Sequence, residues 1–354
     1  MKTHAIIPIF VPHEGCRNSC VFCNQQAITA REKAPDIAET ESIIESHLEQ
    51  IGKNPNISRV DVAFYGGSFT GIPGEHQEEY LKTAKRYKEE GRIQEIHLST
   101  RPDYIDETIL RRLDAFGVDM VELGVQSFDD EVLRLSRRGH DAETVCRSAA
   151  MIKEHGISLG IQLMTGLPGD SYEKSVESAR QAVRLGPDTA RIYPVVILQD
   201  TELCRMYQRG EYSPLPEKEA VRIVRDMLRI FYDAGVYVLR VGLKSTGNIT
   251  SGGGAVAGGE YHPAFRQMAE AALAREDLEN MLEEQLKGVS PERRKGLKTT
   301  FYAAPGSFSV MAGPGKSNKL YFSGKYPELN LKFAADPEMP RNKYRVRIEF
   351  ADKL

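Results

Sequence analysis

The stretch HAIIPIFVPHEGCRNSCVFC, residues 4–23, joins a short apolar run to a loop that contains three cysteines. Residues 4–11 are almost entirely apolar, which is typical of a buried strand. Cys16, Cys20 and Cys23 follow as CxxxCxxC, before the first helical pattern begins. Chemistry in parallel strand–helix folds lies on loops at the carboxyl ends of the strands. This stretch therefore predicts the first unit of such a fold, with its chemistry at one edge of the sheet.

The same alternation of strand and helix patterns continues to about residue 245. Further apolar runs of strand length lie at 59–65, 94–100, 120–125, 157–164 and 189–197. Amphipathic stretches separate them near 40–52, 75–90, 106–116, 141–155 and 171–185, and Gly117, Gly156 and Gly186 are in position to end three of these helices. Such repeats predict a parallel sheet with right-handed crossovers. Six units favour an α/β open or partial barrel over a doubly wound sheet.

A different pattern begins beyond this region. A glycine-rich break at 251–254 precedes a helical pattern from about 263 to 287. Apolar and charged residues then alternate in YRVRIEF at 344–350, as in a half-buried antiparallel strand. Turns rich in Pro and Gly near 313–315, 324–327 and 337–340 fit a small β unit. We therefore expect a core over residues 1–248 and a small α+β C-terminal extension over residues 249–354.

The composition and the charge distribution narrow the class of protein. With 354 residues, 41% hydrophobic and 27% charged, the chain has the composition of a globular protein. No apolar run approaches the ~20 residues that span a bilayer. Five cysteines are too few for a disulfide framework, so we expect a cytoplasmic protein without a membrane partner. Residues 286–354 carry 14 Lys/Arg against six Asp/Glu, which is a net charge of +8. Because the whole chain has a net charge of −3, residues 1–285 carry −11.

The cysteine loop has the donor set of a metal centre. Three thiolates on one tight loop can ligate three irons of a cubane cluster, because thiolates are the preferred ligands of iron–sulfur centres. The fourth iron then keeps an open position. The alternative is a zinc site, for which His13 is the available fourth ligand. Cys146 and Cys204 occur in helical patterns, and we expect both to be small buried hydrophobic residues.

CxxxCxxC with an aromatic residue, Phe22, before the last cysteine resembles the signature of the radical S-adenosylmethionine (SAM) superfamily. The resemblance implies a partial (β/α)6 TIM-like barrel and a [4Fe-4S] cluster held by Cys16, Cys20 and Cys23. It implies that SAM chelates the open iron through its amino and carboxylate groups. It also implies an electron donor such as flavodoxin or ferredoxin, reductive cleavage of SAM to a 5′-deoxyadenosyl radical, and hydrogen abstraction from a substrate.

Further segments carry the resemblance to roughly residue 245. In YGGSF at 65–69, Gly66 and Gly67 look like the glycine motif whose backbone meets the SAM amino group. STRPD at 99–103, VELGVQSF at 121–128, RRGH at 137–140 and GLPG at 166–169 resemble segments of two subfamilies. One is the catalytic subunit of Elongator, a tRNA-modifying enzyme, and the other is oxygen-independent coproporphyrinogen oxidase. IYP at 192–194 and DTEL at 200–203 favour the Elongator side.

The same resemblance assigns SAM contacts to four polar residues. Gln126, Arg138 and Gln162 fall where the family contacts the ribose and carboxylate of SAM. A guanidinium suits a carboxylate because its planar fork can donate two hydrogen bonds. Ser99 stands where both subfamilies tend to carry glutamate, so any contact from it to the ribose is weaker or mediated by water.

Two residues near these segments bear on the substrate. Tyr193, at the end of a predicted strand, is a candidate for positioning it. His140 is either a donor to SAM or substrate, or a structural residue. The Elongator subunit continues into an acetyltransferase domain with a glycine-rich loop. In AGPGK at 312–316, Pro314 lacks an amide donor and no helical pattern follows, so we expect no acetyl-CoA chemistry.

The basic C-terminal region is a candidate surface for tRNA, with a solvated strand face as the alternative. Its cations are Arg293, Arg294, Lys295, Lys316, Lys319, Lys343, Arg345 and Arg347, and Tyr321, Phe322 and Tyr344 are interleaved among them. Two other functions remain open. One is a tetrapyrrole enzyme similar to oxygen-independent coproporphyrinogen oxidase, and the other is a non-catalytic carrier that binds the cluster and SAM.

Overall fold

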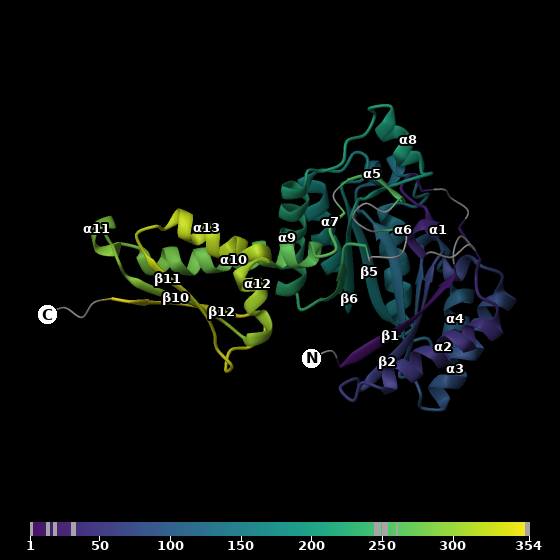
Figure 1. Cartoon of the computed structure of the whole chain (residues 1–354). Coiled ribbons are helices and arrows are strands. Elements are labelled where there is room, and N and C mark those ends of the chain that lie inside the picture. The colour runs from purple at the N-terminus through teal and green to yellow at the C-terminus, as the bar shows by residue number, and fades with distance from the viewer. Residues whose placement is uncertain are drawn as a thin grey trace. The chain divides into compact units, whose positions relative to one another are not determined.

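The computed structural model describes residues 3–11, 15–16, 20–29, 33–243, 249, 254–259 and 261–350. Its chain divides into two compact units, which Figure 1 shows together. The first unit comprises residues 1–220 and 230–263, and the second comprises residues 221–229 and 264–354. The predicted division into residues 1–248 and 249–354 stays a prediction.

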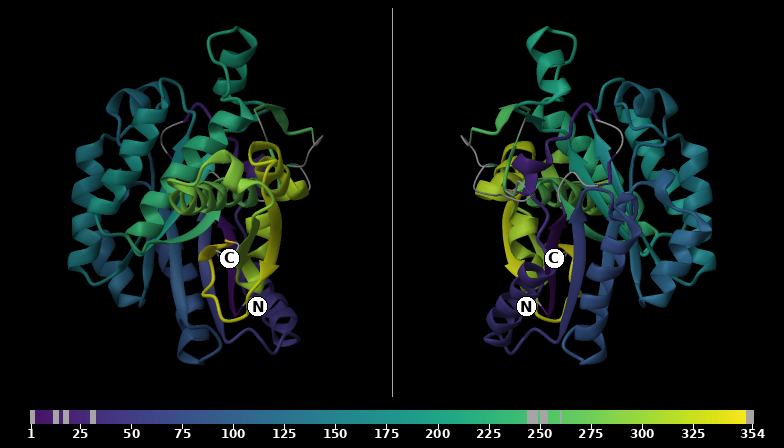
Figure 2. Two further views of the ribbon diagram at one scale, coloured as in Figure 1. Left: turned by 90° about the vertical axis from the view of Figure 1, so that its left-hand side faces the viewer. Right: turned by 90° about the vertical axis from the view of Figure 1, so that its right-hand side faces the viewer.

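A parallel sheet forms the centre of the first unit. Its strands follow the order β1-β2-β3-β4-β5-β6-β8, and every neighbouring pair is parallel. They are β1 (His4–Val11), β2 (Arg59–Gly66), β3 (Glu95–Thr100), β4 (Met120–Gln126), β5 (Ser158–Thr165), β6 (Thr189–Pro194) and β8 (Tyr237–Val241). The sheet is curved into a partial barrel (Figures 1 and 2). The predicted partial barrel is confirmed, with β8 as a seventh strand at the edge.

Helices follow the strands along the outside of this sheet (Figure 2). Those that follow β1 to β5 are α1 (Gln25–Thr29), α2 (Ile37–Gly52), α3 (Gly74–Glu89), α4 (Glu107–Ala115), α5 (Asp130–Leu135), α6 (Ala142–Glu154) and α7 (Tyr172–Arg184). After β6 along the chain come α8 (Glu202–Gln208) and α9 (Glu217–Asp233), of which residues 221–229 belong to the second unit. Short 3-10 turns lie at Phe69–Gly71 and Pro102–Tyr104, and β7 (Ile197–Leu198) pairs antiparallel with β9 (Val256–Gly258). The five helices predicted from amphipathic spacing are α2, α3, α4, α6 and α7.

Local sequence signals set the ends of these helices. The side chains of Asp36, Asp106, Asp129, Asp141 and Ser171 each accept a hydrogen bond from a backbone amide in the first turn of α2, α4, α5, α6 and α7. Gly117, Gly156 and Gly186 follow the ends of α4, α6 and α7 with φ of 68°, 72° and 61°, as predicted. The connections between strands are therefore encoded locally, and the carboxyl ends of the strands meet at one edge.

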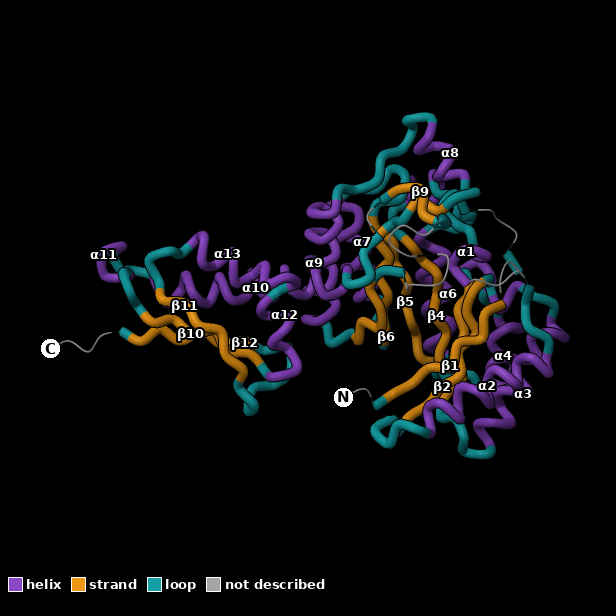
Figure 3. Tube along the Cα trace, viewed as in Figure 1, coloured by secondary structure: helices purple, strands orange, loops and turns teal. Residues whose placement is uncertain are grey.

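The second unit packs helices on a three-stranded sheet. It contains α10 (Phe265–Leu286), α11 (Pro291–Arg294), β10 (Lys298–Ala303), α12 (Phe308–Ala312), α13 (Ser317–Lys325), β11 (Asn330–Ala335) and β12 (Tyr344–Glu349), with 3-10 turns at Pro305–Ser307 and Pro314–Lys316. Figure 3 shows helices and strands of this unit by colour. The predicted helix and the alternating strand are present. The expectation that no helix follows AGPGK was wrong, because α13 begins at Ser317.

The part of the chain that the structure describes contains no helix able to cross a membrane. None of its helices combines the length and the apolar character that crossing a bilayer demands.

Candidate active site at the carboxyl ends of the strands

The cysteine loop lies directly after β1, at the carboxyl edge of the sheet. The amide of Cys23 donates to the carbonyl of Cys20 at 3.1 Å, which closes a tight turn between these two cysteines. Cys16 is exposed, Cys20 and Cys23 are half-buried, and none of the three is in a disulfide. His13, the fourth ligand of the alternative zinc site, lies outside the described residues.

Val21 anchors the middle of this loop to two distant segments. Its amide donates to the carbonyl of Ser136 at 3.2 Å, and its carbonyl accepts from the amide of Leu203 at 2.7 Å. Its side chain is buried in an apolar cluster, against which the half-buried Phe22 packs. The residues between Cys20 and Cys23 therefore fix the loop by packing, and the aromatic residue before Cys23 takes part in this.

Two buried arginines converge on the sulfur of Cys20. Arg138 Nη1 donates to Cys20 Sγ at 3.1 Å, and its Nη2 donates to the carbonyl of Gly124 near the end of β4. Arg101, which follows β3, donates from Nη1 to the same sulfur at 3.9 Å and from Nη2 to the carbonyl of Arg138. Positive charge beside a thiolate offsets its negative charge, which is a surrounding that suits a metal-ligating sulfur.

The carboxylate of Asp103 holds Arg101 in this position. Arg101 donates two hydrogen bonds of 2.9 Å to it. Burial opposes the charged form of that carboxylate, but the neighbouring His140 and Arg101 outweigh it and lower the pKa of Asp103 to about 2. Burial lowers the pKa of His140, whose Nδ1 lies 3.7 Å from Asp103 and whose Nε2 lies 3.3 Å from the carbonyl of Val125. His140 thus lies between Asp103 and the end of β4.

The segment at Gly66 and Gly67 connects the end of β2 to the cysteine loop. Gly66 has φ of 114°, and a Cβ there would lie 2.8 Å from the carbonyl oxygen of Val11. The amide of Gly67 donates to that same oxygen at 2.7 Å. Ser68 Oγ lies 3.4 Å from Cys16 Sγ. The close approach of two strand ends therefore requires glycine at position 66, independently of any ligand.

Gln126 ends β4 in a strained conformation. Its φ is 71°, which non-glycine residues seldom adopt, and the pairing of β4 with β5 is irregular between Gly124 and Gln126. A Cβ on Gly124 would lie 3.1 Å from Gln126 Nε2 and 3.3 Å from Arg138 Nη2. The glycine therefore leaves the space that both predicted polar side chains occupy, and strain of this kind gathers at functional sites.

The other two predicted residues, Ser99 and Gln162, contact each other in the barrel interior. Gln162 Nε2 donates to Ser99 Oγ and to Glu122 Oε2, both at 3.3 Å. The predicted polar residues thus form two groups. One group, with Arg138, lies at the cysteines, and the other consists of Ser99 on β3 and Gln162 on β5.

A buried ion pair on β4 and β6 was missed from the sequence. Arg191 Nε donates to Glu122 Oε2 at 2.5 Å, and Nη2 donates to Glu122 Oε1 at 3.0 Å and to the hydroxyl of Tyr65 at 2.6 Å. Burial, and then the charge of Glu122, raises the pKa of Tyr65 far above its usual range. For Arg191 burial acts in the other direction, but Glu122 outweighs it and raises its pKa. A charged residue at the centre of an otherwise apolar strand, as in MVELGVQ, is the signal that identifies such a pair.

Tyr193, the candidate for positioning the substrate, lies near this pair. It is half-buried, burial raises its pKa, and the charges of Arg191 and Glu122 also act on it. The two cysteines outside the loop behave differently from each other. Cys204 is buried as predicted, whereas the expectation for Cys146 was wrong, because α6 turns it to the exposed face.

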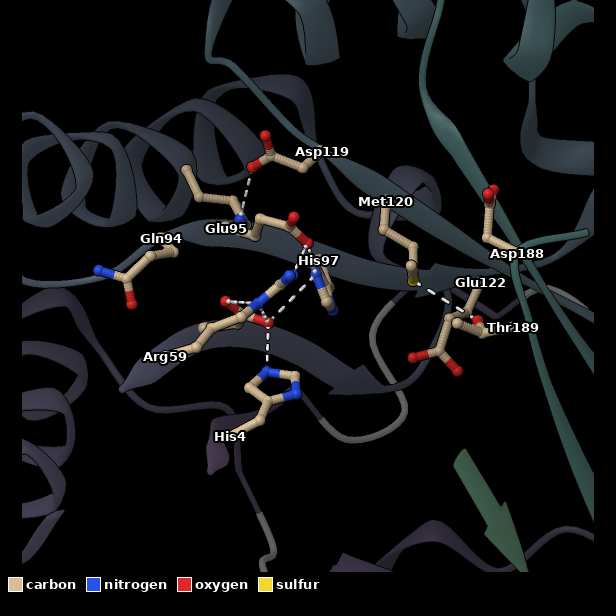
Figure 4. Close-up of polar contacts among 12 residues, drawn as sticks. His4, Arg59, Gln94, Glu95, His97, Asp119, Met120, Glu122, Asp188 and Thr189 are labelled. Atoms are coloured by element: carbon tan, nitrogen blue, oxygen red, sulfur yellow. Dashed lines mark hydrogen bonds and ion pairs between the residues drawn. The ribbon is translucent and has the colours of Figure 1, made fainter. Parts of the chain in front are cut away.

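A second polar cluster lies at the opposite, amino ends of β1, β2 and β3 (Figure 4). Asp61 is fully buried, and its Oδ2 lies 2.5 Å from His4 Nε2 and 3.6 Å from His97 Nε2. Asp61, Glu95 and His97 offer three ligand atoms within 4.8 Å of one another. However, Arg59 Nε donates to both oxygens of Asp61 at 3.2 Å, and its guanidinium also pairs with Glu95.

This cluster is better explained as an ion-pair network than as a metal site. A cation bound to the two carboxylates would meet the positive charge of Arg59. Hydrogen bonds from His97 and the charge of Arg59 lower the pKa of Glu95 against the effect of burial. The amino end of a barrel contributes to stability, and its chemistry lies at the other end.

Comparison with known proteins identifies the family of the barrel. The model of the radical SAM superfamily matches residues 10–182, and that of the radical SAM C-terminal domain matches residues 187–275. The chain belongs to the radical SAM superfamily. As a member it is an enzyme, and its cofactors are SAM and a [4Fe-4S] cluster.

Relatives of this chain include tRNA-modifying proteins. A "tRNA uridine(34) acetyltransferase" from Methanocaldococcus jannaschii is 28% identical over an alignment of 260 residues, and the match covers 62% of this chain and 48% of that protein. "Elongator complex protein 3" from Drosophila melanogaster is 26% identical over an alignment of 203 residues, and the match covers 52% of this chain and 36% of that protein. The chain therefore matches about half of the length of the first relative, and less of the second.

A solved structure shares the fold. It is "The archaeal Methanocaldococcus infernus Elp3 with N-terminus deletion (1-46)", which superposes with a TM-score of 0.64 at 22% identity. The superposition covers 78% of this chain and 64% of that chain. The likeness supports the partial-barrel fold.

Proposed function

We propose that Cys16, Cys20 and Cys23 hold the [4Fe-4S] cluster of this enzyme and that its substrate is tRNA. The observation that carries the first part is the contact of two buried arginines with one sulfur of a three-cysteine loop at the carboxyl edge of the barrel. Bound there together, the cluster and SAM supply reductive cleavage of the sulfonium to methionine and a 5′-deoxyadenosyl radical for hydrogen abstraction. Flavodoxin or ferredoxin is the proposed source of the electron.

The donor set fits an iron–sulfur cluster better than zinc. Tetrahedral zinc, with Zn–S bonds of about 2.3 Å, draws its sulfur ligands to within about 4 Å of one another. Within the described part of the chain, the three metal-ligating side chains whose ligand atoms lie within 4.8 Å of one another are Asp61, Glu95 and His97, at the other end of the barrel. Ligands of a cubane cluster bind separate irons and do not need such close spacing.

The residues around the loop have different proposed roles in binding SAM. Arg138, beside Cys20, is placed to offset thiolate charge and to offer a donor to a carboxylate at the adjacent iron. Gln126 is held next to it by the irregular end of β4. Gly66 and Gly67 offer backbone groups at the end of β2, and Phe22 supports the loop by packing. Ser99 and Gln162, joined by a hydrogen bond, are the proposed contacts to the ribose.

The substrate part of the proposal is supported by the relatives. The curated relatives described above carry names of tRNA-modifying proteins, which favours the tRNA branch over the tetrapyrrole branch. The chain matches about half of the length of the acetyltransferase, so the reaction performed on tRNA is not carried over. A cytoplasmic location belongs to the same proposal, because tRNA and low-potential electron donors are found together there.

The test is anaerobic reconstitution with iron and sulfide, followed by incubation with SAM and dithionite. Iron per chain and 5′-deoxyadenosine are measured for the wild type, for Cys20→Ala and for Cys146→Ala. Cys146 is the matched control, because it is an exposed cysteine outside the loop. We expect Cys20→Ala to lose most of its iron and all 5′-deoxyadenosine, and Cys146→Ala to keep both.

Other outcomes contradict the proposal. Equal iron in all three proteins would mean that the loop does not hold the cluster. Zinc in place of iron after anaerobic purification would show that the donor set had been misread. A full cluster that binds SAM without forming 5′-deoxyadenosine, with tRNA present, would favour a non-catalytic carrier.

A further inference from the structure

The sheet of the second unit has one covered face and one open face. Its strands follow the order β11-β10-β12, with β11 parallel and β12 antiparallel to β10. One face packs on the helices through a core that contains Phe301, Phe322, Val346 and Ile348, with Phe333 packed against it. Phe301 packs between Phe322 and Phe333, with tilted rings at centroid distances of 4.7 and 4.8 Å. Side chains alternate along a strand, so the residues between these belong to the opposite face.

The opposite face, which we call the open face, is rich in cations. Three rows cross it in register: Asn330–Lys298–Glu349, Lys332–Thr300–Arg347 and Ala334–Tyr302–Arg345. All four cations, Lys298, Lys332, Arg345 and Arg347, are exposed, and Glu349 is the one acidic residue in the rows. Arg345 and Arg347 are two residues apart on β12, which places them about 7 Å apart along the strand.

Two of these four cations form ion pairs, and the other two do not among the residues that the structure describes. Lys298 pairs with Glu349 at 2.9 Å, and Arg345 pairs with Asp336 at 2.7 Å. Lys332 and Arg347 make no ion pair with a residue that the structure describes. They lie in the same row on either side of Thr300, which is 4% exposed. The charge of Glu349 in the neighbouring row acts on both, so the middle of the open face carries positive charge that is offset only in part.

An aromatic ring lies beside this charge. The guanidinium carbon of Arg345 lies 4.8 Å from the centre of the Tyr302 ring, and Tyr302 is half-buried. Its neighbour on the other side of the row is Ala334, which adds only a methyl group. A planar ring with a guanidinium beside it and a small residue opposite is a platform on which an unpaired base can stack.

This arrangement corrects the aromatic part of the sequence interpretation. Phe322 is fully buried, Tyr344 packs against the same core, and Tyr321 donates to Glu279 at 2.8 Å. None of the three is in the rows of the open face, and Tyr302 was not considered. Arg293 and Lys295, also part of the predicted basic surface, lie at and after α11, outside the three strands.

We propose that the open face binds RNA, with Lys332, Arg345 and Arg347 on phosphates and Tyr302 stacked on an unpaired base. Charge complementarity favours a polyanion, and the aromatic ring among the cations favours RNA over an acidic peptide. The inference rests on the proposed function in taking tRNA as the RNA. It assigns tRNA contact to a surface outside the cysteine-bearing barrel.

The test measures binding of fluorescein-labelled tRNA to the full chain by anisotropy, from about 50 to 200 mM salt, where counterion release dominates. The variant Lys332→Gln/Arg347→Gln is compared with Arg293→Gln/Lys295→Gln, which removes the same charge from exposed residues of the same unit. We expect the first pair to reduce the slope of log K against log salt by about 1.4 to 1.8, at about 0.7 to 0.9 per phosphate contact. The control pair should leave the slope unchanged.

The aromatic contact is tested separately by Tyr302→Leu and Tyr302→Phe. Loss of stacking should weaken binding by Tyr302→Leu about fivefold or more, whereas Tyr302→Phe keeps a planar ring and should bind as the wild type does. Thermal unfolding confirms that each variant is folded. Equal slopes for the two charge pairs, or wild-type binding by Tyr302→Leu, would overturn the proposal. Displacement of tRNA by polyglutamate as readily as by unlabelled tRNA would show a general anion surface instead of an RNA site.

Failure of this inference can be told from failure of the proposed function. Formation of 5′-deoxyadenosine by the wild type is measured in parallel with and without tRNA. If 5′-deoxyadenosine forms and the open-face variants bind tRNA as the wild type does, the RNA face alone is refuted. If tRNA binds through the open face and a fully loaded cluster yields no 5′-deoxyadenosine, the proposed radical chemistry alone is refuted.

Discussion

The ion pair between Glu122 and Arg191 provides a quantitative test of the barrel interior. Glu122 is 1% exposed, and two hydrogen bonds of 2.5 and 3.0 Å join its carboxylate to the guanidinium. Replacing Arg191 with methionine would leave that carboxylate buried without its counter-ion. Removing one partner of a buried pair typically costs about 3 to 5 kcal/mol. We expect Arg191→Met to lower the free energy of unfolding of the barrel by about this amount.

The double variant Glu122→Gln/Arg191→Met tests the cause of that loss. It removes both charges while nearly keeping the side-chain volumes, so no charge is left buried alone. We expect it to lie within about 1 to 2 kcal/mol of the wild type, with a coupling free energy of at least about 2 kcal/mol between the two positions. The exposed pair Glu49–Lys53 serves as the control, since both side chains are more than two-thirds exposed and such pairs contribute at most about 0.5 kcal/mol.

The assay is unfolding of the cluster-free chain by heat and by urea, followed by circular dichroism. Because the chain has two compact units, each transition is fitted by itself, and only the barrel transition is compared. A double variant whose loss equals the sum of the two single losses would refute the reasoning, because it would show that the two side chains act independently. Equal coupling in the exposed control pair would refute the role of burial.

Three further predictions concern other parts of the barrel. Gly66→Ala should destabilise the barrel by about 3 kcal/mol or more, because the new Cβ would meet the Val11 carbonyl at a φ of 114°. Gly91→Ala should cost only about 1 to 2 kcal/mol, because Gly91 has a φ of 71° and nothing lies within 4 Å of the new Cβ. Similar unfolding midpoints for the two variants would contradict this. Asp103 has a folded pKa of about 2, below its unfolded value, so its contribution to stability is present above about pH 4 and is lost as the pH falls toward 2. Asp103→Asn should therefore be less stable than the wild type by roughly 2 kcal/mol at pH 7, and this difference in the free energy of unfolding should disappear by about pH 2. A difference independent of pH would show that the carboxylate charge is not involved. Finally, chelation with EDTA should leave the unfolding midpoint of the cluster-free chain unchanged, because the carboxylate of Asp61 is paired within the protein, and a lowered midpoint would indicate a bound metal there.

The sequence predicts most of the barrel because its signals are local. Buried strands read as apolar runs, and acidic or hydroxyl caps and terminal glycines fix the helices between them. The edge strand β8 was missed because it is only five residues long and only two of its residues are buried. The helix α13 was missed because GPGK suggests a loop, while the helix begins only at the residue after it.

The candidate site was predicted less completely because it depends on contacts between distant segments. The cysteines follow from one loop, but the contacts of Arg138 and Arg101 with Cys20 join residues 118 and 81 positions apart. The Glu122–Arg191 pair joins two strands through side chains that face the interior, and one sequence does not show which strands align. Tyr302 was missed for a similar reason, since the register of β10 with β12 places it beside Arg345.

Strand β4 connects the interior of the barrel to the cysteine loop. Glu122, in its middle, pairs with Arg191, and Gly124, two residues further on, accepts a hydrogen bond from the arginine that contacts Cys20. Two residues of a strand span about 7 Å, so one short piece of backbone carries both contacts. Gly124 and Gln126 flank the irregularity in the pairing of β4 with β5. We therefore infer that the Glu122–Arg191 pair fixes the position of the end of β4. Iron retained per chain in Arg191→Met should therefore fall together with stability, whereas a full complement of iron in the destabilised variant would show that the loop is held by Val21 and its packing alone.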